Sequence, residues 1–180
     1  LGLHLANSAN APSWARFADR FPWLLANVGG GLLCALISAQ YESLLEVALV
    51  LALFIPVVLA VSESVSMQST TLTLEGIVTG LSPKLGAALL REFKVAVMLG
   101  AMCGGLVGGI AFVWQGQALV ALTIGVSILM SMLTACLMGV ALPSLVHHLR
   151  LDPNVAAGPV TLALVDVATL RLFFNIGGQL

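Results

Sequence analysis

The chain has 180 residues, of which 59% are hydrophobic and only 8% are charged, whereas soluble domains carry roughly 25% charged residues. Its mean hydropathy is +1.07 and its net charge is −1. It therefore has neither a wettable surface nor a basic field for nucleic acid, which excludes a soluble enzyme, a nucleic-acid-binding module and a disordered chain. The long unbroken apolar runs predict an all-α integral membrane protein rather than an outer-membrane barrel, whose strands alternate polar and apolar residues. We expect lipid as a partner, no nucleic acid and no enzymatic activity.

A membrane-spanning helix needs about 20 mostly apolar residues, and five segments meet this requirement. They cover about 22–40, 44–75, 89–114, 118–147 and 153–177. Pro22 suits the first turn of the first helix, and Asp152-Pro153 supplies an N-cap and a first-turn proline for the fifth. We interpret residues 1–19 as either a cytoplasmic connector or an amphipathic helix at the membrane interface. Residues 20–180 then form one five-helix domain.

Basic residues indicate the orientation, because cytoplasmic loops carry an excess of lysine and arginine. Arg171 falls on one side of the predicted helices. The six other basic residues fall on the opposite side: Arg16, Arg20, Lys84, Arg91, Lys94 and Arg150. We expect a multi-pass protein of the cell's inner (plasma) membrane, with the N-terminus in the cytoplasm and the C-terminus outside.

Glycines at a spacing of four residues mark one face of the third predicted helix, namely Gly100, Gly104 and Gly108. Small residues at this spacing let a second helix approach closely. The neighbouring helix can belong to the same chain or to a second copy, and we favour the same chain.

One carboxylate lies where lipid hydrocarbon is expected. Asp166 follows Pro153 by 13 residues, which places it about 20 Å along the fifth helix. An ionised aspartate at mid-membrane costs at least about 2.5 kcal/mol, so it must face a pore or a partner. Arg171 follows five residues later and points to a different face. Pro159, which we place inside this helix, frees a carbonyl below Asp166, and carboxylate and carbonyl oxygens together suit a hard cation.

Glu63 is the second carboxylate in an apolar context. It belongs to the run 62–71, in which eight of ten residues are polar. Such a run, directly after an apolar stretch, cannot face lipid on all sides. Two interpretations stay open. Either one face of the segment lines water or protein, or the segment is leaving the membrane and Glu63 is an interfacial charge.

Three segments resemble the transmembrane domain of the MgtE magnesium channels, which are related to the eukaryotic solute-carrier magnesium transporters. Residues 20–25, Arg-Phe-Pro-Trp-Leu-Leu, resemble the family's R-x-P-W-L start. Residues 54–58, Phe-Ile-Pro-Val-Val, with Gln68-Ser69 after them, resemble its second helix. The most specific segment is 151–166, whose Leu-Asp-Pro, Ala-Ala-Gly-Pro and final aspartate resemble the L-x-x-D-P-a-x-a-S-x-P-x7-D pattern of its fifth helix.

This resemblance implies a homodimer of five-helix subunits, in which helices two and five of both subunits line one pore on the two-fold axis. Asp166 occupies the place of the family's pore aspartate, Mg²⁺ is the implied bound and transported ion, and Glu63 adds a second predicted metal ligand. The family's upstream cytoplasmic regulatory region is expected to precede residues 1–19. The residues predicted to line the pore beside these carboxylates are Ser62, Ser66, Pro159, Leu162, Ala163 and Thr169.

The chain departs from the family in its second helix, where the family has G-G-N-x-G-x-Q. Residues 62–68 are Ser-Glu-Ser-Val-Ser-Met-Gln, so the glycines and the asparagine are replaced and Glu63 is added.

The sequence leads to three hypotheses about function. The first is a divalent cation channel or channel-like transporter, most simply for Mg²⁺. The second is an exchanger coupled to Na⁺ or H⁺ through Glu63. The third is a non-conducting membrane anchor, for which Asp166 is dispensable.

Overall fold

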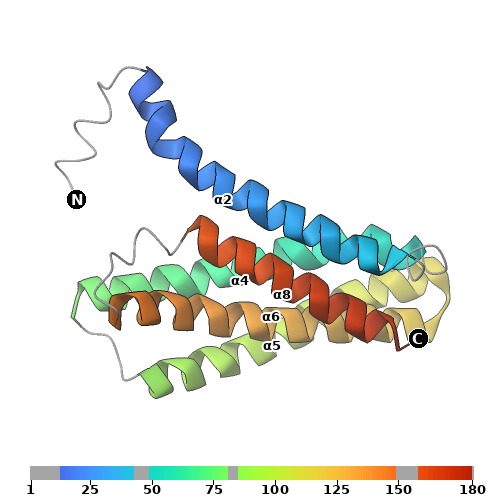
Figure 1. The fold of residues 1–180 in the computed structure, drawn as a ribbon. Coiled ribbons are helices and arrows are strands. Elements are labelled where there is room, and N and C mark those ends of the chain that lie inside the picture. The colour runs from blue at the N-terminus through green and yellow to red at the C-terminus, as the bar shows by residue number, and fades with distance from the viewer. Residues whose placement is uncertain (1–12, 43–48, 81–84, 149–157, 180) are drawn as a thin grey trace.

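The computed structural model describes residues 13–42, 49–80, 85–148 and 158–179. These residues contain no strand and form five helices: α2 (Ser13–Gln40), α4 (Leu49–Val78), α5 (Leu85–Gln115), α6 (Ala118–His148) and α8 (Pro159–Gly177) (Figure 1). The last four are long and apolar enough to cross a membrane, whereas the apolar part of α2, Leu24–Gln40, is shorter. The all-α membrane fold predicted from composition and apolar runs is confirmed.

The first helix begins earlier than predicted. α2 starts at Ser13, so Pro22 lies inside it, and the expected boundary between residues 19 and 20 falls within a continuous helix. Trp14 and Phe17 stack at a ring-centroid distance of 5.3 Å, and Phe17 and Phe21 at 4.9 Å. This row of aromatic rings at helical spacing stabilises the added turns.

The last helix begins later than predicted. α8 starts at Pro159, with Gly158 as the residue before it; the expected cap at Asp152-Pro153 lies outside the described residues. A proline in the first turn has no intrahelical hydrogen bond to lose. The expectation that Pro159 frees a carbonyl inside the helix is therefore wrong.

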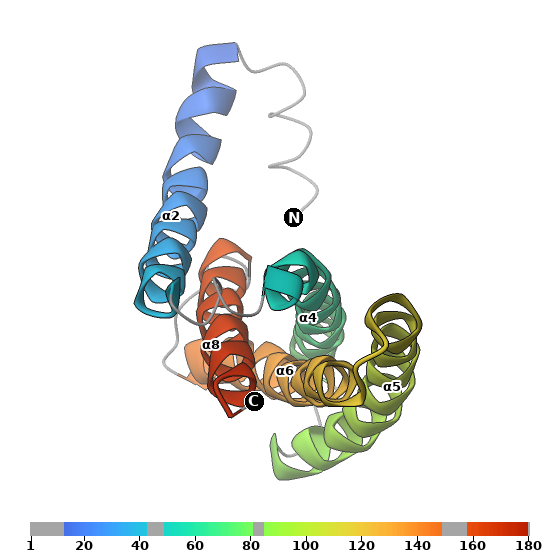
Figure 2. The same ribbon diagram turned by 90° about the vertical axis from the view of Figure 1, so that its right-hand side faces the viewer.

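The centre of the bundle is α6, which packs against α4, α5 and α8 (Figure 2). α8 also packs against α4 and α2, and α2 has α8 as its main neighbour. Figure 1 shows that α4 and α6 run in one direction, whereas α5 and α8 run in the other. At the C-terminal ends of α2 and α8, Tyr41 stacks on the fully buried Phe174 at 4.9 Å. α8 is thus held between α2, α4 and α6.

Close contact between α5 and α6 confirms the prediction made from the glycine spacing. A Cβ atom at Gly108 would lie 2.8 Å from the carbonyl oxygen of Ala121, and one at Gly104 would collide with the carbonyl oxygen of Gly125. The two helices are joined by a turn in which Gly116 has a φ of 69°, a conformation that glycine adopts at little cost. The partner of this glycine face is a helix of the same chain.

We expect Gly104→Ala to lower the free energy of unfolding by about 1–3 kcal/mol, because the new methyl group must displace the backbone of α6. The measurement is thermal or denaturant-induced unfolding in detergent. Gly105→Ala is the matched control, since a Cβ atom there meets nothing within 4 Å. That control should be neutral or slightly stabilising, because alanine is the better helix former. Equal destabilisation by both variants would contradict the assigned contact.

Candidate functional site

Asp166 lies near the middle of α8, seven residues after Pro159 and eleven before Gly177. Its side chain is partly buried, whereas that of Arg171 is exposed. The charged neighbour of Asp166 is not Arg171 but Glu63 of α4. Helical geometry already argues against an ion pair between Asp166 and Arg171. In the structure, Asp166 instead lies next to a second acidic side chain.

Glu63 lies at the middle of α4, 14 residues after Leu49 and 15 before Val78. Because the whole of α4 is a candidate membrane span, this position favours the interpretation in which Glu63 faces water or protein within the membrane. Its carboxyl group lies close enough to that of Asp166 for the two groups to interact electrostatically. Two carboxyl groups in contact need a proton or a cation to offset their repulsion. The site is therefore suited to attract positive charge halfway across the membrane.

Three of the residues predicted to line the pore are buried inside the single chain. Ser62 and Thr169 are 1% exposed and Ser66 is fully buried. On α4, Ser62 and Ser66 are one turn apart and follow the face that packs into the bundle. The backbone carbonyl of Ser66 lies against Gly139 of α6. These hydroxyl groups therefore face neighbouring helices of their own chain.

The other three predicted pore residues are half-buried and lie along the first two turns of α8. They are Pro159, Leu162 and Ala163. Ala163 packs against α2, where a Cβ atom at Gly30 would lie only 2.5 Å from the Ala163 Cβ. The glycine thus allows α2 to lie directly on α8, one turn before Asp166.

A row of polar side chains runs along the C-terminal half of α4. None of these residues was among the site residues predicted from the sequence. Ser64, Gln68, Thr71 and Glu75 are all exposed, and Gln68 Nε2 donates a hydrogen bond to Ser64 Oγ at 3.4 Å. Their spacing of four, three and four residues places them on one face of the helix. That face must meet water or another protein surface, because polar side chains are costly in lipid. The spacing itself is the signal from which this row could have been predicted.

Glu92 of α5 is a third carboxylate within the bundle, at 8% exposure. Its Oε2 accepts hydrogen bonds from Ser69 Oγ of α4 at 3.3 Å and from Cys136 Sγ of α6 at 3.8 Å. Oε1 lies 3.7 Å from the exposed Arg91 guanidinium. In the sequence, Glu92 lies between the basic residues Arg91 and Lys94 at the start of a predicted helix, so its burial between three helices is a feature that only the structure reveals.

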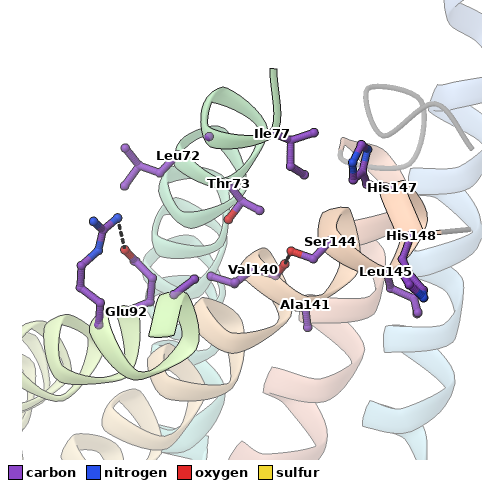
Figure 3. Close-up of a pocket in the computed structure, with 13 residues that line it drawn as sticks. Leu72, Thr73, Ile77, Glu92, Val140, Ala141, Ser144, Leu145, His147 and His148 are labelled. Carbon is purple, nitrogen blue, oxygen red and sulfur yellow. Dashed lines mark hydrogen bonds and ion pairs between the residues drawn. The ribbon is translucent and has the colours of Figure 1, made fainter. Parts of the chain in front are cut away.

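Glu92 also lines a cavity of about 550 Å³ between α4, α5 and α6 (Figure 3). The walls are mostly apolar, with Leu72 and Val140 among them, and His147 and His148 line the end formed by α6. Figure 3 shows Glu92 approaching from α5 on the opposite side. Glu92 thus ties the C-terminal half of α4 to α5 and α6 while remaining next to this cavity.

No three histidine, cysteine, aspartate or glutamate side chains in the described part of the chain lie close enough to hold one metal ion. The Glu63–Asp166 pair therefore supplies at most two carboxylate ligands from one chain. A divalent cation there would complete its shell with water or with ligands from another copy. Mg²⁺ commonly keeps several waters and is held by one or two carboxylates, so the pair fits that ion.

These features define the class of protein: a polytopic α-helical membrane protein with an acidic pair halfway along two adjacent spans. The family model MgtE, described as a divalent cation transporter, matches residues 55–176, which include both Glu63 and Asp166. The chain therefore belongs to the MgtE family. Members of this family are transporters rather than enzymes, in agreement with the prediction from composition.

Three relatives carry the name magnesium transporter MgtE. The protein from Bacillus subtilis is 28% identical over 159 residues, or 87% of this chain. Those from Enterococcus faecalis and Thermus thermophilus are 29% and 30% identical, each over 164 residues, or 90% of this chain. The chain spans only 35–36% of the length of these relatives.

Proposed function

We propose that the chain is the membrane-spanning part of a magnesium transporter that conducts hydrated Mg²⁺ along a path between α4 and α8. The observation that carries this proposal is the contact between Glu63 and Asp166 at the middle of two adjacent spans. The names of the three relatives support Mg²⁺ as the ion. Both carboxylates act as ligands of the ion or of its water shell.

The path is completed by a second copy of the chain, in a homodimer with the pore on its two-fold axis. Three observations support this arrangement. The described part of the chain brings no third carboxylate to the Glu63–Asp166 pair, the polar row of α4 is exposed in the single chain, and α2 packs mainly on α8 rather than on α4. Two-fold symmetry doubles every ligand, so two copies supply four carboxylates to the path.

The polar row Ser64, Gln68, Thr71 and Glu75 gives the ion a hydrated route from the acidic pair to the C-terminal end of α4. Arg91 and Lys94 lie in the first turns of α5, at that end of the bundle, which we place in the cytoplasm of an inner-membrane protein. The N-terminus is then cytoplasmic and the C-terminus is outside. Ions entering from outside would meet the acidic pair first and leave along the polar row.

Uptake of Mg²⁺ into liposomes tests the transport mechanism. The purified chain is reconstituted with a Mg²⁺ indicator inside, and a potassium gradient with valinomycin sets an inside-negative voltage, without any Na⁺ or pH gradient. For a doubly charged ion, 100 mV contributes about 4.6 kcal/mol, enough for an accumulation of about 10³-fold. We expect uptake whose rate rises with the voltage.

Two other outcomes would replace the proposal. Uptake that appears only with an opposing Na⁺ or H⁺ gradient would indicate an exchanger, a mechanism that the Glu63–Asp166 contact also suits because a shared carboxyl pair can carry a proton. An equal leak in protein-free liposomes and in liposomes with the chain, under every gradient, would indicate a membrane anchor without transport activity.

A further inference from the structure

Six buried side-chain oxygens lack a hydrogen-bond partner within the described residues. One is Asp166 Oδ1. The others are hydroxyl groups on residues that are at most 1% exposed: Ser62, Ser66, Ser127, Ser131 and Thr169. A buried polar group without a partner costs about 1–3 kcal/mol. Native structures contain only a few such groups, and each one needs an explanation.

Hydroxyl groups elsewhere in these helices bond to their own backbone. Ser38, Thr73, Thr134 and Ser144 each donate to the carbonyl four residues earlier, at 2.7–3.0 Å. This bond is the usual way in which serine and threonine are satisfied within a membrane helix. None of these four residues is fully buried. The buried hydroxyl groups do not make this bond, which leaves their oxygens free to bind a ligand between helices.

Contacts between helices place several of these oxygens at one level of the bundle. Ser69 Oγ of α4 lies 3.2 Å from Cys136 Sγ of α6, and both helices run in the same direction (Figure 1). At 1.5 Å per residue, Ser62 lies about 10 Å, and Ser131 about 8 Å, from this contact toward the helix N-termini. Ser62 and Ser131 are therefore close to the same level.

α8 reaches that level through Asp166, which contacts Glu63, the residue next to Ser62. The direction in which Ser131 points from α6 agrees with a position between α4 and α8. Ser131 lies about 120° round the helix from Gly125, and Gly125 meets Gly104 of α5. A buried Ser131 therefore points away from α5, toward the two other neighbours of α6, which are α4 and α8.

We propose that each chain binds one dehydrated monovalent cation, Na⁺, between α4, α6 and α8. Its ligands are the hydroxyl oxygens of Ser62 and Ser131 and the Oδ1 atom of Asp166, with Ser66 and Thr169 one turn to either side. Hydroxyl and carboxylate oxygens suit a hard cation, whose positive charge also offsets the repulsion between the Asp166 carboxyl and the neighbouring Glu63 carboxyl. Mg²⁺ holds its water too firmly for such an enclosed position. This site lies within one chain and goes beyond the proposed transport path, with which it shares only Asp166.

Thermal unfolding of the purified full chain tests this site without any Mg²⁺. The protein is titrated in EDTA with NaCl, with choline chloride keeping the ionic strength constant. We expect a saturable rise in Tm with Na⁺, and a midpoint concentration at least tenfold higher in Ser131→Ala. Ser144→Ala is the matched control, because the Ser144 hydroxyl bonds to its own helix at Val140 O; it should keep the wild-type midpoint.

Direct binding of ²²Na⁺ to the wild-type protein in detergent provides a second measurement, which does not depend on the folding of any variant. Unlabelled Na⁺ should displace the label, and choline should not. The proposal would be overturned if no ²²Na⁺ were displaced, or if Ser131→Ala left the Na⁺ midpoint unchanged. Ordered water would then be the hydrogen-bond partner of these hydroxyl groups. Neither measurement involves magnesium or flux, so either result leaves the proposed transport function to be judged by its own experiment.

Discussion

Asp166→Asn is expected to reduce voltage-driven Mg²⁺ uptake into liposomes by roughly tenfold or more. Two unit charges 4 Å apart interact by about 4 kcal/mol at an effective dielectric constant near 20, whereas a tenfold change needs only about 1.4 kcal/mol. The side chain lies in the middle of α8 and contacts the Glu63 carboxyl. Asparagine keeps its size and one acceptor oxygen, so the loss reports the charge rather than the packing. The measurement is the initial uptake rate at fixed voltage and protein density.

Arg171→Gln is the matched control for this substitution, because it neutralises an exposed charge five residues further along the same helix. It should keep at least half of the wild-type rate. A second measurement is stabilisation by Mg²⁺: the rise in Tm with added Mg²⁺ should be smaller in Asp166→Asn and intact in Arg171→Gln. Wild-type uptake and wild-type Mg²⁺ stabilisation in Asp166→Asn would remove Asp166 from the path.

The membrane spans could be predicted well because their length is set by the bilayer rather than by tertiary contacts. The helix predicted at 118–147 is Ala118–His148, and the one predicted at 89–114 is Leu85–Gln115. The N-terminal ends of α2 and α8 were less predictable, because they depend on local side-chain interactions and on the position of proline. A proline can occupy the first turn of a helix or the position just before it, so a proline alone does not fix where α8 begins. Aromatic rings such as Phe17 and Phe21 can extend a helix through a segment of mixed polarity, as they do in α2.

The candidate site was predictable only as separate residues. Asp166 and Glu63 are conspicuous because charges are scarce in the chain, but their contact depends on which faces of α4 and α8 meet. Sequence periodicity could not settle this for α4, which has apolar residues on every side in its first half and polar residues on several sides in its second. Packing against α6 assigns Ser66 to the interior and leaves Ser64 on the open face.

The buried position of Glu92 also could not be predicted from the sequence, because it depends on which helix faces meet. Its hydrogen-bond donors Ser69 and Cys136 are 23 and 44 residues away in the sequence. A carboxylate close to arginine and lysine at the start of a helix is typical of a solvated connection. Only the packing of three helices identifies Glu92 as a buried acceptor. The glycine row of α5 was more informative, because small residues at a spacing of four specify close approach whatever the neighbour is.

Glu63→Gln is expected to impair Mg²⁺ uptake in the wild-type background and to have a much smaller effect once Asp166 is already asparagine. Two carboxyl groups that contact one another and bind one ion act as a unit, so their substitutions should be non-additive by about 0.5–3 kcal/mol. The measurement is a double-mutant cycle on uptake rates for the wild type, both single variants and the double variant. Competition by Ca²⁺ in the same assay reports whether Glu63 also sets ion preference.

Glu42→Gln is the matched control for the cycle, since Glu42 is an exposed carboxyl just after the end of α2 and outside the proposed path. Its effect should be the same with or without Asp166→Asn. If Glu63→Gln also proves additive with Asp166→Asn, the two carboxyl groups serve separate ions or separate steps, and the shared site is refuted. A coupled Glu63 and an uncoupled Glu42 would show that the residue this chain has in place of the family's glycine-rich signature belongs to the ion path itself.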